Sequence, residues 1–129
     1  MKEIESRADV HYLVSSFYSK IRKDDLLGPI FNKHIAEHQW PEHIEKLTDF
    51  WVGNFFGIRN FKGNPAMKHV LVDRGQNQQI AQYHFDRWLA LWAETIDAHF
   101  EGGLAEGAKI VATRIGTAQL RIMQGSRQY

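Results

Sequence analysis

Residues 38–69 read HQWPEHIEKLTDFWVGNFFGIRNFKGNPAMKH. A helix is predicted over 41–56, because Pro41 suits a first helical turn and apolar side chains then recur at helical spacing. The breaker-rich run 57–65 predicts a loop. Residues 66–69 could form a single further turn. Two helical pieces joined by a long irregular connection are therefore expected here.

Each piece carries a histidine at an informative position. His43 shares one predicted helical stripe with Leu47, Phe50 and Trp51, and His69 ends the second piece. Two such imidazoles could face each other across a flat apolar ligand, and haem is the ligand that requires this arrangement. The alternative is that both are ordinary hydrogen-bonded core histidines.

Composition narrows the class of protein. The chain has 129 residues, 43% of them hydrophobic, and no cysteine. Its length predicts one domain, 1–129, and the missing thiols exclude iron–sulfur clusters, thiolate-ligated haem and thioether-attached haem. The net charge is only +1 and the basic residues are scattered along the chain instead of clustered, so no nucleic-acid partner is expected.

No segment suggests a membrane or export. The first residues lack an apolar core of signal-peptide length, and no run approaches the ~18 apolar residues of a membrane span. We therefore expect a cytoplasmic protein without a membrane partner.

The rest of the chain also predicts helices. No strand pattern or internal repeat occurs, so the predicted class is all-α. Residues 24–31 are predicted to be a corner, a short turn broken by Gly28 and Pro29. Ser6 or Asp9 can cap the first helix. The main helices are predicted over 10–23, 41–56, 78–100 and 104–123.

The sequence also contains a short pattern that is typical of some zinc sites. His34, Glu37 and His38 spell the H-x-x-E-H arrangement of some zinc hydrolases, in which a helix presents two histidines and a general-base glutamate. Pro41 would end such a helix almost at once. A solvated polar loop is the favoured interpretation, and a zinc hydrolase is kept as a remote alternative.

Several runs together resemble the truncated haemoglobins, specifically their third group. The similarity covers nearly the whole chain. It rests on FYSKIRKDDLLGPIF (17–31), WPEH (40–43), DFWVG (49–53), GNPAMKH (63–69) and RWLALW (87–92). This resemblance implies a two-over-two helical globin sandwich enclosing non-covalent haem b.

The resemblance also implies roles for individual residues. His69 matches the proximal iron ligand, whereas Tyr18, His43 and Trp88 match polar residues of the distal pocket. The expected cofactor contacts are Phe31, Leu47, Phe50, Phe85 and, through a propionate, Lys68. Arg59 and Lys62 are further propionate candidates, and no role is assigned to Tyr83 or His84.

The functional expectation follows from the polar pocket. Dioxygen acquires negative charge when it binds, so several donors should hold it tightly and release it slowly. This favours nitric-oxide dioxygenation or peroxide chemistry with an external reductase, and the expected small ligands are O2, NO, CO or peroxide. Oxygen storage or sensing without turnover is the alternative.

Overall fold

The computed structural model describes residues 1–57 and 81–126, with side chains through residue 118. These residues form helices and contain no strand; one isolated bridge joins Lys2 to Phe100. The all-α prediction is confirmed. The elements are α1 (Arg7–Lys23), α2 (Gly28–His34), the 3-10 turn η1 (Glu37–Gln39), α3 (Trp40–Phe56), α5 (Gln82–His99) and α6 (Gly103–Ser126).

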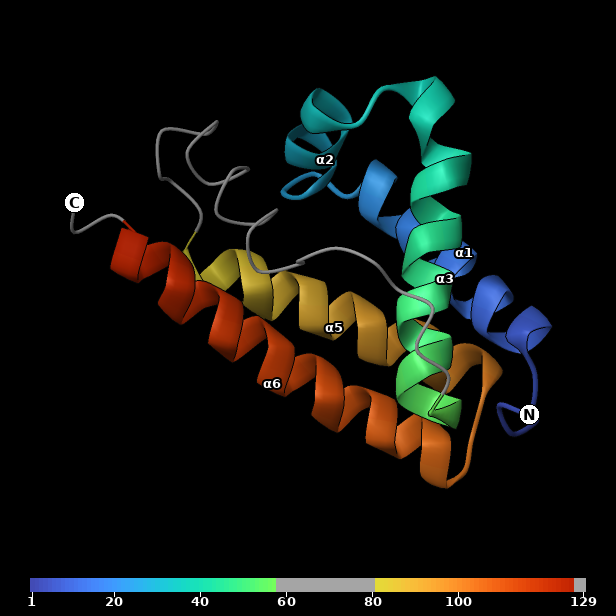
Figure 1. Ribbon diagram of the computed structural model, residues 1–129. Helices are drawn as coiled ribbons and strands as arrows, with labels where there is room; N and C mark the ends of the chain where they lie inside the picture. Colours follow the sequence, from blue (N-terminus) through green and yellow to red (C-terminus); the bar gives the residue numbers. More distant parts are fainter. Residues whose placement is uncertain (58–80, 127–129) are drawn as a thin grey trace.

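The helices form two pairs. Helix α1 crosses α3, while α5 and α6 run antiparallel, side by side (Figure 1). Contacts between α1 and α5 join the pairs. No helix within these described stretches is long and apolar enough to cross a membrane.

Helix α1 begins three residues before the predicted start at residue 10. Ser6 is its N-cap, and Asp9 is the third residue of a capping box. The Asp9 carboxylate accepts the Ser6 N–H at 3.2 Å, and the Ser6 hydroxyl accepts the Asp9 N–H at 3.4 Å. Both candidate caps are thus used, each satisfying a donor that a helix terminus leaves unpaired.

The expected corner at 24–31 is partly wrong, because Gly28 and Pro29 begin a helix instead of breaking one. Pro29 lies in the first turn of α2. There its missing N–H costs nothing and its fixed φ matches the helix. The helix then continues to His34.

The remaining boundaries follow the predictions closely. Helix α3 begins at Trp40 and ends before Gly57, which adopts the left-handed φ of 76° that favours glycine. Helix α5 begins at Gln82, and the expected positions 78–80 lie outside the described residues. Helix α6 is longer than predicted at its C-terminal end, reaching Ser126.

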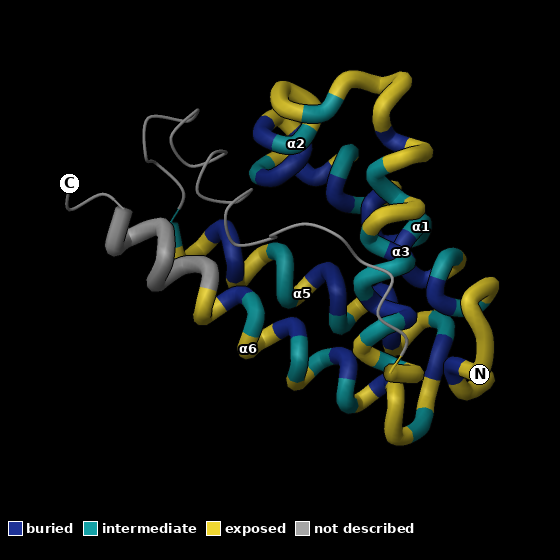
Figure 2. Tube along the Cα trace, in the orientation of Figure 1, coloured by how far each residue is buried: buried dark blue, intermediate teal, exposed yellow. Residues whose placement is uncertain are grey.

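The core lies where the two pairs meet (Figure 2). Trp92 is its centre: its ring stacks on Trp51 at 4.7 Å and meets the edge of Phe17 at 4.9 Å. Its indole N–H donates to the Ala108 carbonyl at 3.2 Å. Aromatic burial of this kind stabilises the fold, provided that each polar tip is paired.

Candidate distal site

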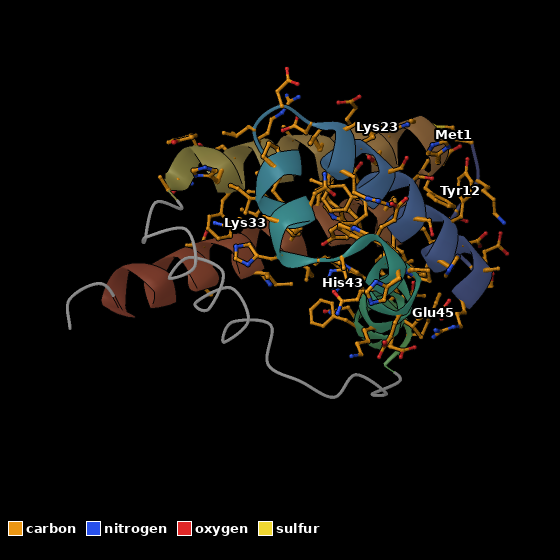
Figure 3. The ribbon with its side chains drawn as sticks, turned by 90° about the horizontal axis from the view of Figure 1, so that it is seen from above. Met1, Tyr12, Lys23, Lys33, His43 and Glu45 are labelled. Carbon is orange, nitrogen blue, oxygen red and sulfur yellow. The ribbon has the colours of Figure 1, made fainter. Side chains whose placement is uncertain are left out.

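Four residues expected to share a pocket lie together at the α1–α3 crossing. The Tyr18 ring meets those of His43 and Phe31 edge-on, at centroid distances of 5.8 and 6.0 Å. Trp88, on α5, donates its indole N–H to the Tyr18 oxygen. Figure 3 shows His43 on α3, beside this crossing. Residues that are 70 positions apart in the chain therefore form one cluster, called here the distal cluster: Tyr18, Phe31, His43 and Trp88.

Tyr18 is the chemical centre of this cluster. Its side chain is only 7% exposed. Burial raises the pKa of the phenol to about 12, and the hydrogen bond from Trp88 opposes that rise. The hydroxyl thus stays protonated at neutral pH. Because its oxygen accepts from Trp88, its own hydrogen is available to donate elsewhere.

Helix α3 presents two neighbouring stripes of different burial. Trp51, in the first, is buried in the core. His43, Leu47 and Phe50 recur one turn apart in the second and are only half-buried. A largely apolar stripe that the protein covers only in part suits the face of a flat apolar group. These residues therefore fit a haem.

Phe85 is held differently from the other expected cofactor contacts. It is 6% exposed and packs on α6, where a Cβ added to Gly116 would lie 3.5 Å from its ring. The small residue on α6 makes room for the ring. Its position adjoins the α5–α6 contact, whereas the distal cluster draws its residues from α1, α2, α3 and α5.

The residues left without a role have structural positions. His84 Nδ1 accepts the Ala81 N–H at 2.9 Å and so caps the start of α5. Tyr83 is 58% exposed and stacks on the His84 ring at 4.3 Å. An imidazole at the third helical position replaces the usual acidic group, which is why no capping signal was apparent in the sequence.

Trp40 is a member of this neighbourhood that sequence reasoning missed. Its ring lies 5.8 Å from Tyr18 and 5.4 Å from His43, and the Arg22 guanidinium sits 4.9 Å above it. The side chain is buried, yet its indole N–H has no hydrogen-bond partner in the part of the chain that is described. The only sequence signal, the step before Pro41, concerned the helix start.

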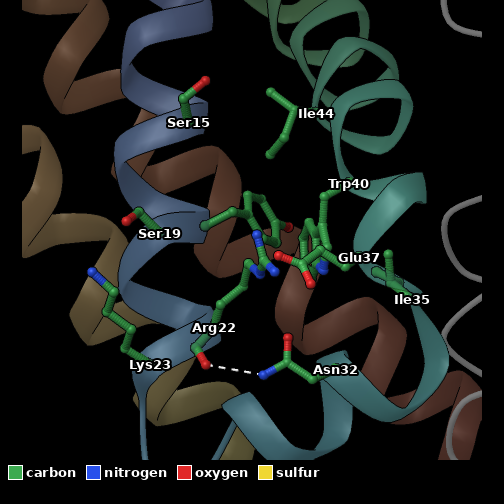
Figure 4. Close-up of a pocket in the computed structure, with 10 residues that line it drawn as sticks. Ser15, Ser19, Arg22, Lys23, Asn32, Ile35, Glu37, Trp40 and Ile44 are labelled. Carbon is green, nitrogen blue, oxygen red and sulfur yellow. Dashed lines mark hydrogen bonds between the residues drawn. The ribbon is translucent and has the colours of Figure 1, made fainter.

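A cleft of about 620 Å³ lies on the outer side of Trp40 (Figure 4). Arg22 and Lys23 line it from α1, and Glu37 lines it from η1. Tyr18 belongs both to this cleft and to the distal cluster, whereas His43 does not line the cleft. His43, Leu47 and Phe50, the half-buried stripe of α3, do not line this cleft.

The expected iron ligand and the expected propionate partners fall in a part of the chain that the structure does not describe. His69 and Lys68 lie outside the described residues, as do Arg59 and Lys62. The loop at 57–65 and the turn at 66–69 fall there too, apart from Gly57. Their roles stay predictions.

The helical premise of the zinc alternative fails. His34 is the last residue of α2, and Ile35 adopts an extended conformation before η1 begins. His34 and His38 therefore do not share a helix, as the zinc pattern requires. Among residues 1–57 and 81–126, no three histidine, cysteine or acidic side chains are grouped to hold a metal ion.

Comparisons with known proteins agree with this geometry. Residues 2–114 match the bacterial-like globin family. A group 3 truncated haemoglobin of Campylobacter jejuni, ctb, is 34% identical over 97 residues, which make up 74% of this chain and 72% of the relative. The crystal structure of a group III truncated haemoglobin from the same organism superposes with a TM-score of 0.84, at 29% identity, covering 95% of both chains. Globins bind haem and, through it, small gas ligands such as O2. The chain belongs to the group III truncated haemoglobins.

Proposed function

We propose that this protein binds haem b non-covalently through His69 and holds O2 in a polar distal pocket that serves NO or peroxide chemistry. The haem iron supplies the bond to the gas ligand and the change of oxidation state. The half-buried stripe of His43, Leu47 and Phe50 supports a haem face against α3. Family membership supports the cofactor itself.

One arrangement carries the polar-pocket proposal: Tyr18 and Trp88 both pack edge-on against Phe17, at 4.8 and 5.6 Å, and hydrogen bonding from Trp88 acts on the Tyr18 phenol. This bond orients the phenol, so that its hydrogen can point toward a ligand. The pKa of about 12 keeps that hydrogen in place at neutral pH. A ligand that carries partial negative charge is then met by a preorganised donor in a site of low water content.

His43 adds a third polar group beside Tyr18. Its ring is edge-on to both Tyr18 and Trp40, at 5.8 and 5.4 Å, and is held within an otherwise apolar stripe. An imidazole with packed neighbours keeps its orientation, so it offers a fixed nitrogen with little reorganisation.

This pocket suits chemistry better than delivery. Charge-assisted bonds strengthen with the charge on the ligand, so several donors slow the release of O2. In dioxygenation, NO, O2 and one electron would combine to nitrate, and the bound haem would supply that electron, with an external reductase as its source. The pocket residues hold the O2 during this step and exclude water.

The test is nitrate production. Ferrous protein loaded with O2 is mixed rapidly with NO, and nitrate is measured against free haem under the same conditions. We expect stoichiometric nitrate at a rate well above that of free haem. A rate no better than that of free haem, together with slow turnover of peroxide, would contradict the proposal and favour oxygen storage or sensing.

A further inference from the structure

A single carboxylate connects three helices. Asp24 is the C-cap of α1. One oxygen, Oδ2, accepts the N–H groups of Leu26 at 3.1 Å and Leu27 at 3.0 Å, just before α2. The other, Oδ1, accepts from Arg87 Nε at 2.7 Å and Nη2 at 2.6 Å, on α5. The backbone carbonyl of Asp24 accepts the Gly28 N–H at 2.9 Å.

These three helices are the ones that carry most of the distal cluster. Tyr18 lies on α1, Phe31 on α2 and Trp88 on α5, directly after Arg87. The hydrogen bond from Trp88 to Tyr18 spans α5 and α1. It therefore crosses the same junction as the ion pair between Arg87 and Asp24.

The junction has little freedom to adjust. A Cβ at Gly28 would lie 2.7 Å from the Arg22 carbonyl oxygen, so α2 is seated directly on the last turn of α1. The Asn32 amide donates to the same carbonyl at 3.0 Å. With α1 and α2 locked together, the Asp24 carboxylate presents a fixed point to α5.

We propose that Asp24 and Arg87 are a positioning pair for the distal donors. The pair sets where α5 lies against α1 and so brings the Trp88 indole N–H to the Tyr18 oxygen. This inference rests on the proposed function, in which Tyr18 and Trp88 act on the bound ligand. Neither Asp24 nor Arg87 belongs to the distal cluster, so the pair acts through Tyr18 and Trp88.

The charge state of the pair supports this role. Burial alone would raise the pKa of Asp24, but the hydrogen bonds from Arg87, Leu27 and Leu26 outweigh it and hold the pKa below its usual value. Hydrogen bonding to Asp24 likewise raises the pKa of Arg87. The Asp24 side chain is 3% exposed and that of Arg87 is 50% exposed, so the anchor is buried and its partner reaches it from the surface.

The test separates the two partners. Arg87→Ala removes the link to α5 while leaving Asp24 to bond the start of α2, and Arg87→Lys restores the charge. The readouts are the O2 and CO dissociation rates of the haem-loaded protein and the Trp88 indole N–H resonance of its CO form. The chain has four tryptophans, so a Trp88→Phe variant assigns that resonance.

We expect Arg87→Ala to raise the O2 dissociation rate about tenfold, at the low end of losing a donor altogether. The CO rate should change less than about threefold, since CO carries little charge. The Trp88 N–H resonance should move in Arg87→Ala and return most of the way in Arg87→Lys. Asp24→Asn should act in the same direction as Arg87→Ala.

Arg7→Gln is the matched control. Arg7 pairs with Asp49 at 2.6 Å and Glu45 at 2.9 Å, so it also joins two helices, but it lies three turns from Tyr18. This variant should leave both the O2 rate and the Trp88 resonance unchanged. Equal effects of Arg7→Gln and Arg87→Ala would show general loosening and overturn the proposal.

Failure of the positioning role of Asp24 and Arg87 can be told apart from failure of the proposed function. If Trp88→Phe leaves the O2 rate unchanged, the proposed function fails, yet the Trp88 resonance still reports on positioning. An unmoved resonance in Arg87→Ala overturns the positioning role, whatever the O2 rates are.

Discussion

Trp88 and Trp92 lie one turn apart on α5, with ring planes only 8° apart at 6.5 Å, yet their polar atoms are used differently. Trp92 N–H donates to a backbone carbonyl, and so does the nearby buried Thr95 hydroxyl, to Leu91 at 2.7 Å. Trp88 instead donates to a side chain, that of Tyr18. Donors paired with backbone hold the fold, whereas donors paired with a side-chain hydroxyl leave that hydroxyl able to bind something else.

The largest expected effect is the loss of haem in His69→Gly. If His69 is the iron ligand, as proposed, this variant leaves the haem held by apolar contact alone, so the haem should be retained poorly unless free imidazole is added. The Soret absorbance should fall while the helical circular dichroism persists, because Trp92 packs on Phe17 and Trp51 and bonds to Ala108. His43→Ala should keep its haem, and the reverse pattern would exchange the two histidines' roles.

The next effect is on stability. Trp92→Ala should lower the free energy of unfolding by about 3–5 kcal/mol, because it leaves a cavity at the centre of the core. Urea unfolding measures this loss. The O2 dissociation rate should change less than about threefold, under about 0.7 kcal/mol. A larger change in that rate would break the separation between core and distal cluster.

Removing a distal donor should change O2 dissociation much more than it changes the free energy of unfolding. Trp88→Phe and Tyr18→Phe each cost a bound O2 roughly 1.5–3 kcal/mol of stabilisation, or about 10- to 150-fold, mainly in the dissociation rate. CO dissociation should change much less. Stopped-flow measurements decide this, and changes below about threefold in both variants would contradict the polar pocket. The effects need not add, since His43 can compensate for a missing donor.

Alkaline titration tests the burial of Tyr18 directly. Its folded pKa of about 12 exceeds the unfolded value near 10. The contribution of the buried, protonated Tyr18 phenol to the free energy of unfolding is therefore complete below about pH 10 and is lost as the pH rises toward 12. The difference in phenolate absorbance between the native protein and Tyr18→Phe should appear near pH 12. A difference that appears near pH 10 would mean that the phenol is solvated.

The sequence predicted the four main helices because apolar spacing is a local signal. Gly28 and Pro29 were predicted to break a helix, whereas they begin α2. The close packing of α2 on the Arg22 carbonyl, which needs glycine at position 28, is a tertiary contact that residue spacing does not encode. The clustering of Tyr18 with Trp88 came only through resemblance, because no periodicity links α1 to α5.

Two further features of the site depend on non-local contacts. Asp24 and Arg87 are 63 residues apart, and nothing in either segment names the other as its partner. The Trp40 indole N–H has no partner among the described residues, and this depends on everything packed around it, which no local pattern reports. Both features become visible only in the folded chain.

The smallest expected effect is that of Thr95→Val, and it sharpens the comparison along α5. Thr95 is fully buried and lies two turns after Trp88 on the same face. Its hydroxyl donates to the Leu91 carbonyl, but that carbonyl already receives the helical N–H of Thr95 itself. The substitution therefore removes a donor and strands no partner, and unlike Trp92→Ala it leaves no large cavity. Unfolding should change by about 1 kcal/mol or less, with O2 dissociation unaltered. A loss above about 2 kcal/mol would mean that the hydroxyl supports more than its own helix, and that the core and the distal cluster are less separate than their hydrogen bonds indicate.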